Sequence, residues 1–140
     1  GRVVVHSDTV GEMLTAILTT PSTTPVNLAA FDASAWTNQS ASGWGGDRFY
    51  LLAAGKTAEA ARTALTDLKG VWVTTWDTDV DRDEFVAAAP HGSFGPKAVA
   101  QSVDAATAIV YFGFEEAERE ALTKRFAEKP VPMKKEPQRR

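Results

Sequence analysis

The 140-residue chain carries 15 Lys and Arg against 18 Asp and Glu, a formal net charge of −3, and 44% of its residues are hydrophobic. This length suits one domain of ordinary globular composition, and no apolar run approaches the roughly 18–20 residues needed to span a bilayer. The absence of cysteine excludes disulfides, thiolate nucleophiles and cysteine metal sites, and leaves the compartment open.

The first third of the chain predicts a strand and then a helix. We expect a short strand over 3–6 and a helix over about 8–20, capped by Ser7 or Asp8 and stopped by Pro21. The apolar side chains of this helix are expected to face the core: Met13, Leu14, Ile17 and Leu18. The ambiguous stretch 26–36 is interpreted as a short helix carrying Leu28, Phe31 and Trp36 inward, and the polar, glycine-rich 37–46 as a loop or turn.

Beyond this loop, strands and helices alternate. Strands are expected over 49–52, 71–76 and 108–112, with 97–102 as an extended segment, and helices over 57–68, 79–89 and 114–128. The helical side chains expected to be buried are Ala60, Ala61, Ala64, Leu65, Leu68, Val80, Phe85, Val86, Ala117, Leu122 and Phe126. A few strands without a long βαβ series favour an α+β fold, with a small antiparallel or mixed sheet and helices packed mainly on one face.

Charge divides the chain into a body and a tail. Residues 1–128, expected to form the single domain, hold 10 Lys and Arg against 17 Asp and Glu, whereas 129–140 hold 5 against 1. The acidic body would repel nucleic acid, so no nucleic-acid partner is expected. The proline-rich basic tail is expected to be disordered, with weak contact to an anionic surface as the alternative.

A glycine- and tryptophan-rich segment, 42–50, precedes the expected strand at 49–52. It is not a dinucleotide fingerprint, because it leads into a strand rather than a helix, and it lacks the Gly-Lys-Ser/Thr of a phosphate loop. In a structural interpretation, Trp44 folds onto the core and Asp47 pairs with Arg48 or with backbone amides. In a functional interpretation, these three side chains form the rim of a binding groove.

A second segment, 71–84, ends in alternating carboxylates. It fails as an EF-hand because Arg82 stands where glycine is required, Ala88 where an acidic ligand is required, and a strand is expected where a helix should enter. We interpret Asp77 or Asp79 as the cap of a helix with an acidic first turn, and a loosely bound hard cation as the alternative.

The chain lacks a recognisable catalytic or metal-binding motif. Its two histidines, His6 and His91, belong to no His-Glu-x-x-His sequence, and no Gly-x-Ser-x-Gly motif is present. We therefore predict no catalytic residue, no metal ligand and no cofactor.

The chain resembles an uncharacterised bacterial group whose members often carry a metallopeptidase-like segment upstream. The resemblance lies in Val10-Gly11-Glu12, Gly43-Trp44-Gly45-Gly46-Asp47-Arg48, Trp76-Asp77-Thr78 and Asp83-Glu84-Phe85. It implies a C-terminal module of a secreted or envelope-associated protein. Because the sequence contains no zinc-binding helix, the resemblance assigns peptidase activity to none of its residues. The chain begins at Gly1 without methionine, and we expect it to be trimmed or processed.

These observations predict a non-catalytic accessory or binding module whose partner is an upstream domain of the same polypeptide or another protein. Its expected binding residues are Trp44, Asp47, Arg48, Trp76 and Asp77. The alternative is a stand-alone hydrolase in which His6 joins a carboxylate cluster, with or without a metal, and a third is a structural, self-associating domain. The sequence does not predict the oligomeric state.

Overall fold

The computed structural model describes residues 1–21 and 37–129, so the expected helix at 26–36 and almost all of the expected tail lie outside it. The described residues form a five-stranded antiparallel sheet in the order β1-β2-β3-β5-β4. The strands are β1 (Arg2–Asp8), β2 (Trp44–Ala54), β3 (Lys69–Trp76), β4 (Ala98–Ser102) and β5 (Thr107–Phe112). The helices are α1 (Glu12–Thr19), α2 (Ala58–Ala64), α3 (Asp79–Ala88) and α4 (Glu116–Glu128), with a 3-10 turn, η2 (Ala89–His91), after α3. The predicted α+β class is confirmed.

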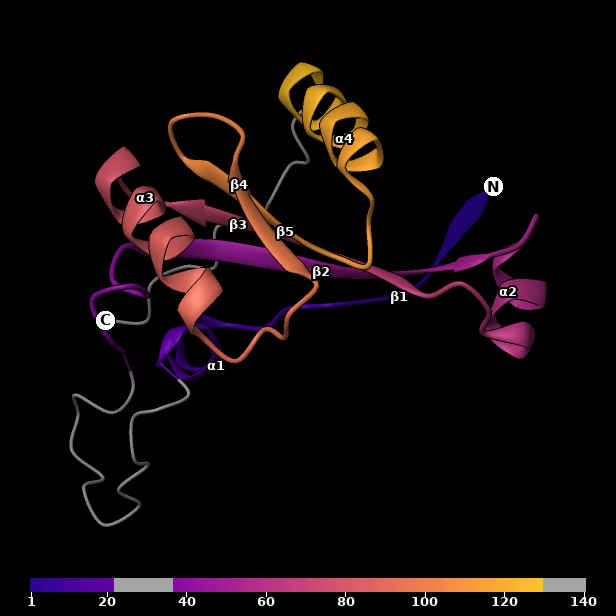
Figure 1. Ribbon diagram of the computed structural model, residues 1–140, viewed down its shortest axis with the longest axis horizontal. Coiled ribbons are helices and arrows are strands. Elements are labelled where there is room, and N and C mark those ends of the chain that lie inside the picture. Colours follow the sequence, from indigo (N-terminus) through magenta and orange to yellow (C-terminus); the bar gives the residue numbers. More distant parts are fainter. Residues whose placement is uncertain (22–36, 130–140) are drawn as a thin grey trace, which may run out of the picture.

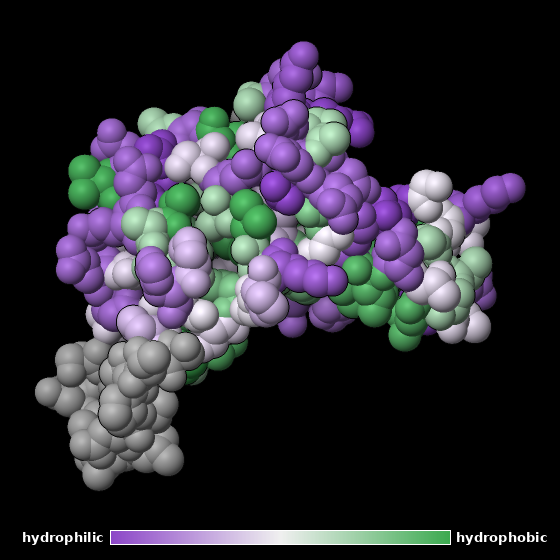
Figure 2. Space-filling view, viewed as in Figure 1, coloured by the Kyte–Doolittle hydropathy of each residue, from purple (hydrophilic) through white to green (hydrophobic). Residues whose placement is uncertain are grey.

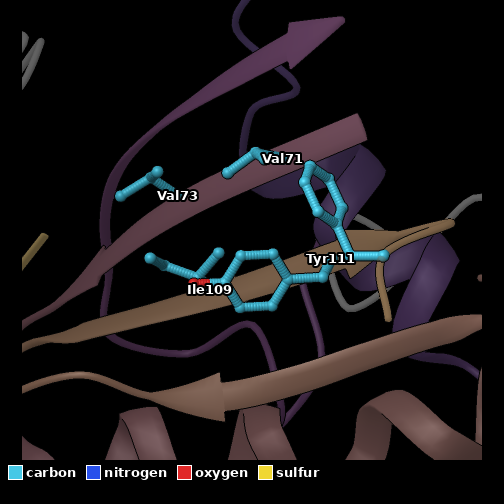
Figure 3. Close-up of a cluster of buried hydrophobic side chains, with 5 residues drawn as sticks. Val71, Val73, Ile109 and Tyr111 are labelled. Atoms are coloured by element: carbon cyan, nitrogen blue, oxygen red, sulfur yellow. The ribbon is translucent and has the colours of Figure 1, made fainter. Parts of the chain in front are cut away.

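The core occupies both faces of the sheet around β3 and β5. Because side chains alternate along a strand, Trp72 and Trp76 of β3 lie on one face with Val110 of β5. The opposite face holds two side chains from each strand, which gather together in Figure 3: Val71, Val73, Ile109 and Tyr111. We call these the tryptophan face and the valine face.

Helices cover the two faces unequally. α1 and α3 pack on the tryptophan face through Leu18 and Phe85, and the segment after η2 adds Phe94. Of the described helices, α4 covers the valine face, on the other side of the sheet in Figure 1, and contributes Leu122 and Phe126. Its outer surface is mostly hydrophilic in Figure 2. α2 lies at one end of the molecule, beside β1.

Charged groups fasten α4 to the sheet. Glu118 Oε2 accepts hydrogen bonds from Lys69 Nζ at 2.6 Å and from the Glu115 N–H at 2.9 Å. Its other oxygen accepts from Arg2 Nη1 at 3.0 Å. The hydrogen bond from Lys69, followed by that from the Glu115 N–H, lowers the pKa of Glu118 from 4.5 to about 2. Glu118 thus joins the first turn of α4 to both β1 and β3.

Several predicted boundaries are wrong. β2 begins at Trp44, so the end of the expected loop is a strand. α1 begins only at Glu12, with Gly11 at its N-cap, because Asp8 still belongs to β1. The N-cap of α3 is Thr78, whose hydroxyl accepts from the Asp81 N–H at 3.1 Å, rather than Asp77 or Asp79.

The expected inward faces of α2, α3 and α4 are also partly wrong. α2 ends at Ala64 because Leu65 adopts the left-handed conformation, with φ of 45°. Leu65 and Leu68 are consequently exposed, as is Val80 in the first turn of α3. Ala60, Ala64 and Ala117 are exposed as well, whereas Ala61 and Phe85 are buried as predicted.

Candidate functional site

The Asp47 carboxylate ties β2 to the beginning of α1. Its Oδ1 accepts the Val10 N–H and its Oδ2 accepts the Gly11 N–H, each at 2.7 Å. Asp47 is 7% exposed, so a carboxylate is buried beside two backbone donors that precede the helix. A buried carboxylate requires such donors. Of the two structural interpretations of Asp47, pairing with backbone amides is the one observed.

Two tryptophans, Trp44 and Trp76, lie beside Asp47 where β2 and β3 meet the start of α1. Trp44 and Trp76 are partners across β2 and β3, and both pack on the tryptophan face. The Trp44 indole N–H donates to Asp47 Oδ2 at 3.2 Å. Trp76 is buried, stacks on Phe85 with ring centroids 4.8 Å apart, and donates its indole N–H to Thr74. Trp44 is half-buried, whereas Trp76 is enclosed by the core.

The glycines of this segment permit close approach to the start of α3. Gly43 has φ of 75°, and a Cβ atom there would lie 2.4 Å from the Asp81 carboxyl carbon. The Gly43 carbonyl accepts the Asp77 N–H at 2.8 Å. Only glycine combines this backbone conformation with this contact. Asp77 therefore contributes its backbone to the junction, while its side chain is exposed.

Arg48 does not join the group formed by Trp44, Asp47 and Trp76. It follows Asp47 directly along β2, and it pairs with Val73 of the valine face. Successive strand residues point to opposite faces, so Arg48 lies across the sheet from Asp47, and it is exposed. The Asp47–Arg48 pair considered from the sequence does not form.

A second set of hydrogen bonds holds the C-terminal end of α1; we call this set and the Asp47 contacts at the N-terminal end the two clasps of the helix. The Asn38 side-chain amide donates to the Ala16 carbonyl at 2.8 Å and to Thr19 Oγ1 at 3.1 Å, and its oxygen accepts the Ala41 N–H. Beyond η2, the Ser93 N–H donates to the Leu18 carbonyl at 2.8 Å. α1 is therefore fixed at its N-terminal end by Asp47 and at its C-terminal end by Asn38 and Ser93.

Held in this way, α1 turns outward three of the four apolar side chains that were expected inward, whereas Leu18 packs on the tryptophan face as predicted. Its buried residues are Thr15, Ala16 and Thr19, whereas Met13 is 43%, Leu14 44% and Ile17 52% exposed. The buried threonine hydroxyls are satisfied within the helix, by the Gly11 carbonyl for Thr15 and the Thr15 carbonyl for Thr19. In the described ranges, seven large hydrophobic side chains are exposed, and three of them, Met13, Leu14 and Ile17, lie on this one short helix.

The residues considered for hydrolysis do not assemble in the described part of the chain. His6 Nε2 lies 3.9 Å from Asp8 Oδ2, and both side chains are more than 60% exposed on β1. Asp47 is already bound by backbone amides. Within 1–21 and 37–129, no three His, Asp or Glu side chains form a group that could hold a metal ion.

Comparison with known proteins gives one result. The family model described as a domain of unknown function, DUF8575, matches residues 2–107, which is most of the chain. The chain belongs to this family. No curated protein and no solved structure matches it. The DUF8575 match includes Asn38, Asp47 and all of α1, so both clasps of the helix lie within the family segment.

Pairing of Asp47 with backbone amides was one interpretation of the sequence, but the sequence did not identify Val10 and Gly11 as the donors or α1 as the element that they position. An amphipathic helical pattern ordinarily predicts that the larger apolar side chains are buried. The signal to the contrary was the row of small residues at 15, 16 and 19, which lets α1 approach the sheet closely. The sequence gave no indication that Asn38 binds the C-terminal end of α1, because its partners Ala16 and Thr19 lie about 20 residues earlier in the chain.

Within the described ranges, no helix is both long and apolar enough to cross a bilayer.

Proposed function

We propose that the chain is a non-catalytic binding module of a larger secreted or envelope-associated bacterial protein, and that the outer face of α1 is its contact surface. The observation that carries this proposal is the exposure of Met13, Leu14 and Ile17 on one helix clasped at both ends. The partner is an upstream domain of the same polypeptide or another protein. In this proposal Trp44, Asp47 and Trp76 support α1 and do not touch the partner.

The energy available to such a partner is modest. Complete burial of a large aliphatic side chain contributes about 1.5–3 kcal/mol. Met13, Leu14 and Ile17 are each about half exposed, so covering them contributes roughly 2–4 kcal/mol in all. That suits a contact within one polypeptide or at part of a wider interface, because an independent complex must also offset the entropy lost on association.

The secreted or envelope location rests on the resemblance described from the sequence and on the chemistry of the chain. A cysteine-free sequence is unaffected by an oxidising compartment. Fractionation of the producing cells tests this part. Recovery in the medium or envelope supports it, and recovery only with the cytoplasm contradicts it.

The contact surface is tested by thiol labelling, because the chain has no cysteine of its own. The Leu14→Cys variant is labelled in two preparations: the isolated chain and the native polypeptide purified from the producing cells. Ala87→Cys, an exposed position on α3, is the matched control. We expect labelling at 14 to be at least about tenfold slower in the native polypeptide, the factor expected from about 1.4 kcal/mol of protection, with no change at 87. Equal rates at 14 in both preparations would overturn the proposal.

A further inference from the structure

The two edges of the sheet differ in a way that bears on self-association. β1 and β4 are the edge strands. The outward backbone groups of an edge strand are free to pair with another strand, and proteins commonly block them with charges, bulges or covering groups. In the described part of the chain, charges and a bulge interrupt β1, whereas β4 has neither.

β1 carries several blocking features. Arg2, His6 and Asp8 place charged or titratable side chains along it, and its register with β2 shifts between Val4 and His6. The Val5 carbonyl within this irregularity accepts a hydrogen bond from Arg62 Nε of α2 at 2.9 Å. A second strand would have to displace Arg62 and follow an irregular backbone.

Within the described residues, β4 carries no charged side chain, no bulge and no side-chain hydrogen bond to its outward backbone groups, although α3 and η2 pack beside it. Its sequence, Ala-Val-Ala-Gln-Ser, contains no charge and no proline, and it pairs with β5 without a register shift. The Val103 N–H donates to the Thr107 carbonyl, so odd-numbered residues face β5. The N–H and C=O groups of Ala100 and Ser102 therefore point away from β5. In the described part of the chain, no backbone hydrogen bond outside the sheet ladder uses them.

We propose that β4 pairs antiparallel with β4 of a second copy of this chain, joining two five-stranded sheets. A register centred on Ala100 places Ala98 opposite Ser102 and Val99 opposite Gln101. Small or neutral side chains then meet at every position. This neutrality decides in favour of a second copy, because two bodies with an excess of acidic residues meet there without like charges in register.

The same difference limits the assembly to two copies. Pairing of β4 with β4 is two-fold symmetric and uses up the open edge of both copies. The blocked β1 edges are then the outer edges of the joined sheet, so growth stops. A five-residue strand buries less than the roughly 800 Å² per partner of a standard interface, and the dimer is therefore weak and concentration-dependent.

Sedimentation equilibrium of the full chain from about 10 μM to on the order of 1 mM tests this proposal, a range that detects dissociation constants of these magnitudes. The test variant is Ala100→Pro, which removes an outward N–H while leaving the ladder with β5 intact. Val4→Pro removes an outward N–H from the blocked edge and is the matched control. We expect the wild type and Val4→Pro to approach the dimer mass, and Ala100→Pro to weaken the dimer about tenfold, since each copy loses a donor.

Hydrogen exchange of the wild-type chain gives a readout that needs no variant. The amides of Ala100 and Ser102 should exchange more slowly as concentration rises. A wild type that stays monomeric at the highest concentration overturns the proposal, as does a dimer that Ala100→Pro leaves unchanged. A dimer abolished by Ile17→Glu also overturns it, because that result assigns self-association to α1.

Discussion

Asp47 shows how one side chain determines the position of a whole helix. Its two oxygens bind the two N–H groups that precede α1, and the Trp44 indole completes the contact. We expect Asp47→Ala to lower the free energy of unfolding by about 1–3 kcal/mol, because it leaves two partly buried donors without an acceptor. Asp47→Asn should cost less, since it keeps one acceptor oxygen. The control, Arg48→Ala, should stay within about 0.5 kcal/mol. Urea denaturation measures all three, and equal losses for Asp47→Ala and Arg48→Ala would contradict this role.

Glu118 makes the fold sensitive to acid. Its pKa is lowered from 4.5 to about 2 by hydrogen bonds from Lys69 and the Glu115 N–H. The folded state therefore keeps this carboxylate charged where the unfolded chain has protonated it. The resulting stabilisation is fully present above about pH 4.5 and is lost as the pH falls towards 2.

The Glu118→Gln substitution removes the charge and retains one acceptor oxygen. This variant should have a lower Tm at neutral pH, and its Tm should depend less on pH between 4.5 and 2. Thermal unfolding across this range measures the effect. Glu116→Gln, an exposed neighbour in the same turn of α4, should leave the pH dependence unchanged. If both variants follow the wild-type curve, Glu118 does not fasten α4.

At the scale of elements, the sequence predicted which segments are helices better than it predicted which side they bury. β3 was recognisable because it is β-branched and aromatic throughout. The inward position of Leu18 in α1 was predicted, but the exposure of Met13, Leu14 and Ile17 was not. The orientation of α1 depends on contacts from Asn38, Asp47 and Ser93, which lie far away in the sequence. α2 was predicted too long because the left-handed conformation of Leu65 leaves no mark in the apolar pattern.

α3 provides a direct comparison between two side chains that the sequence placed together in the core. Phe85 is fully buried against Trp72 and Trp76, whereas Val80 is 61% exposed. We expect Phe85→Ala to cost about 3–5 kcal/mol of unfolding free energy and Val80→Ala to change it by no more than about 0.5 kcal/mol. Chemical denaturation distinguishes the two. Similar losses at both positions would mean that α3 is rotated from the orientation described.

At the scale of the whole molecule, the α+β class was predictable and the strand order was not. Alternating patterns indicate strands and helices, but they do not reveal that β5 inserts between β3 and β4. The candidate site was similarly half-predictable. Trp44, Asp47 and Trp76 do come together, whereas the strand alternation that separates Arg48 from them becomes certain only once β2 is known to include it.

The position of β5 has a consequence for the extent of the folding unit. The family match ends at Thr107, where β5 begins, yet Ala108 to Tyr111 are fully buried between two strands. A chain ending at Thr107 should therefore lack a cooperative thermal transition, because both faces of β3 lose their neighbouring core. A chain ending at Lys129 should retain it. Circular dichroism during heating compares them, and a cooperative transition in the shorter chain would show that β5 is dispensable.

α1 is held at both ends and exposes three of its four large apolar side chains, Met13, Leu14 and Ile17. Thiol labelling of single-cysteine variants in the isolated chain tests this arrangement most directly. Cysteine at 14 or 17 should react nearly as fast as in the unfolded chain. Cysteine at 16 should react at least about 100-fold more slowly, as expected for a site that is exposed only when the structure opens. Protection at 14 and 17 together with rapid labelling at 16 would contradict the account, because α1 would then bury the face that we describe as exposed.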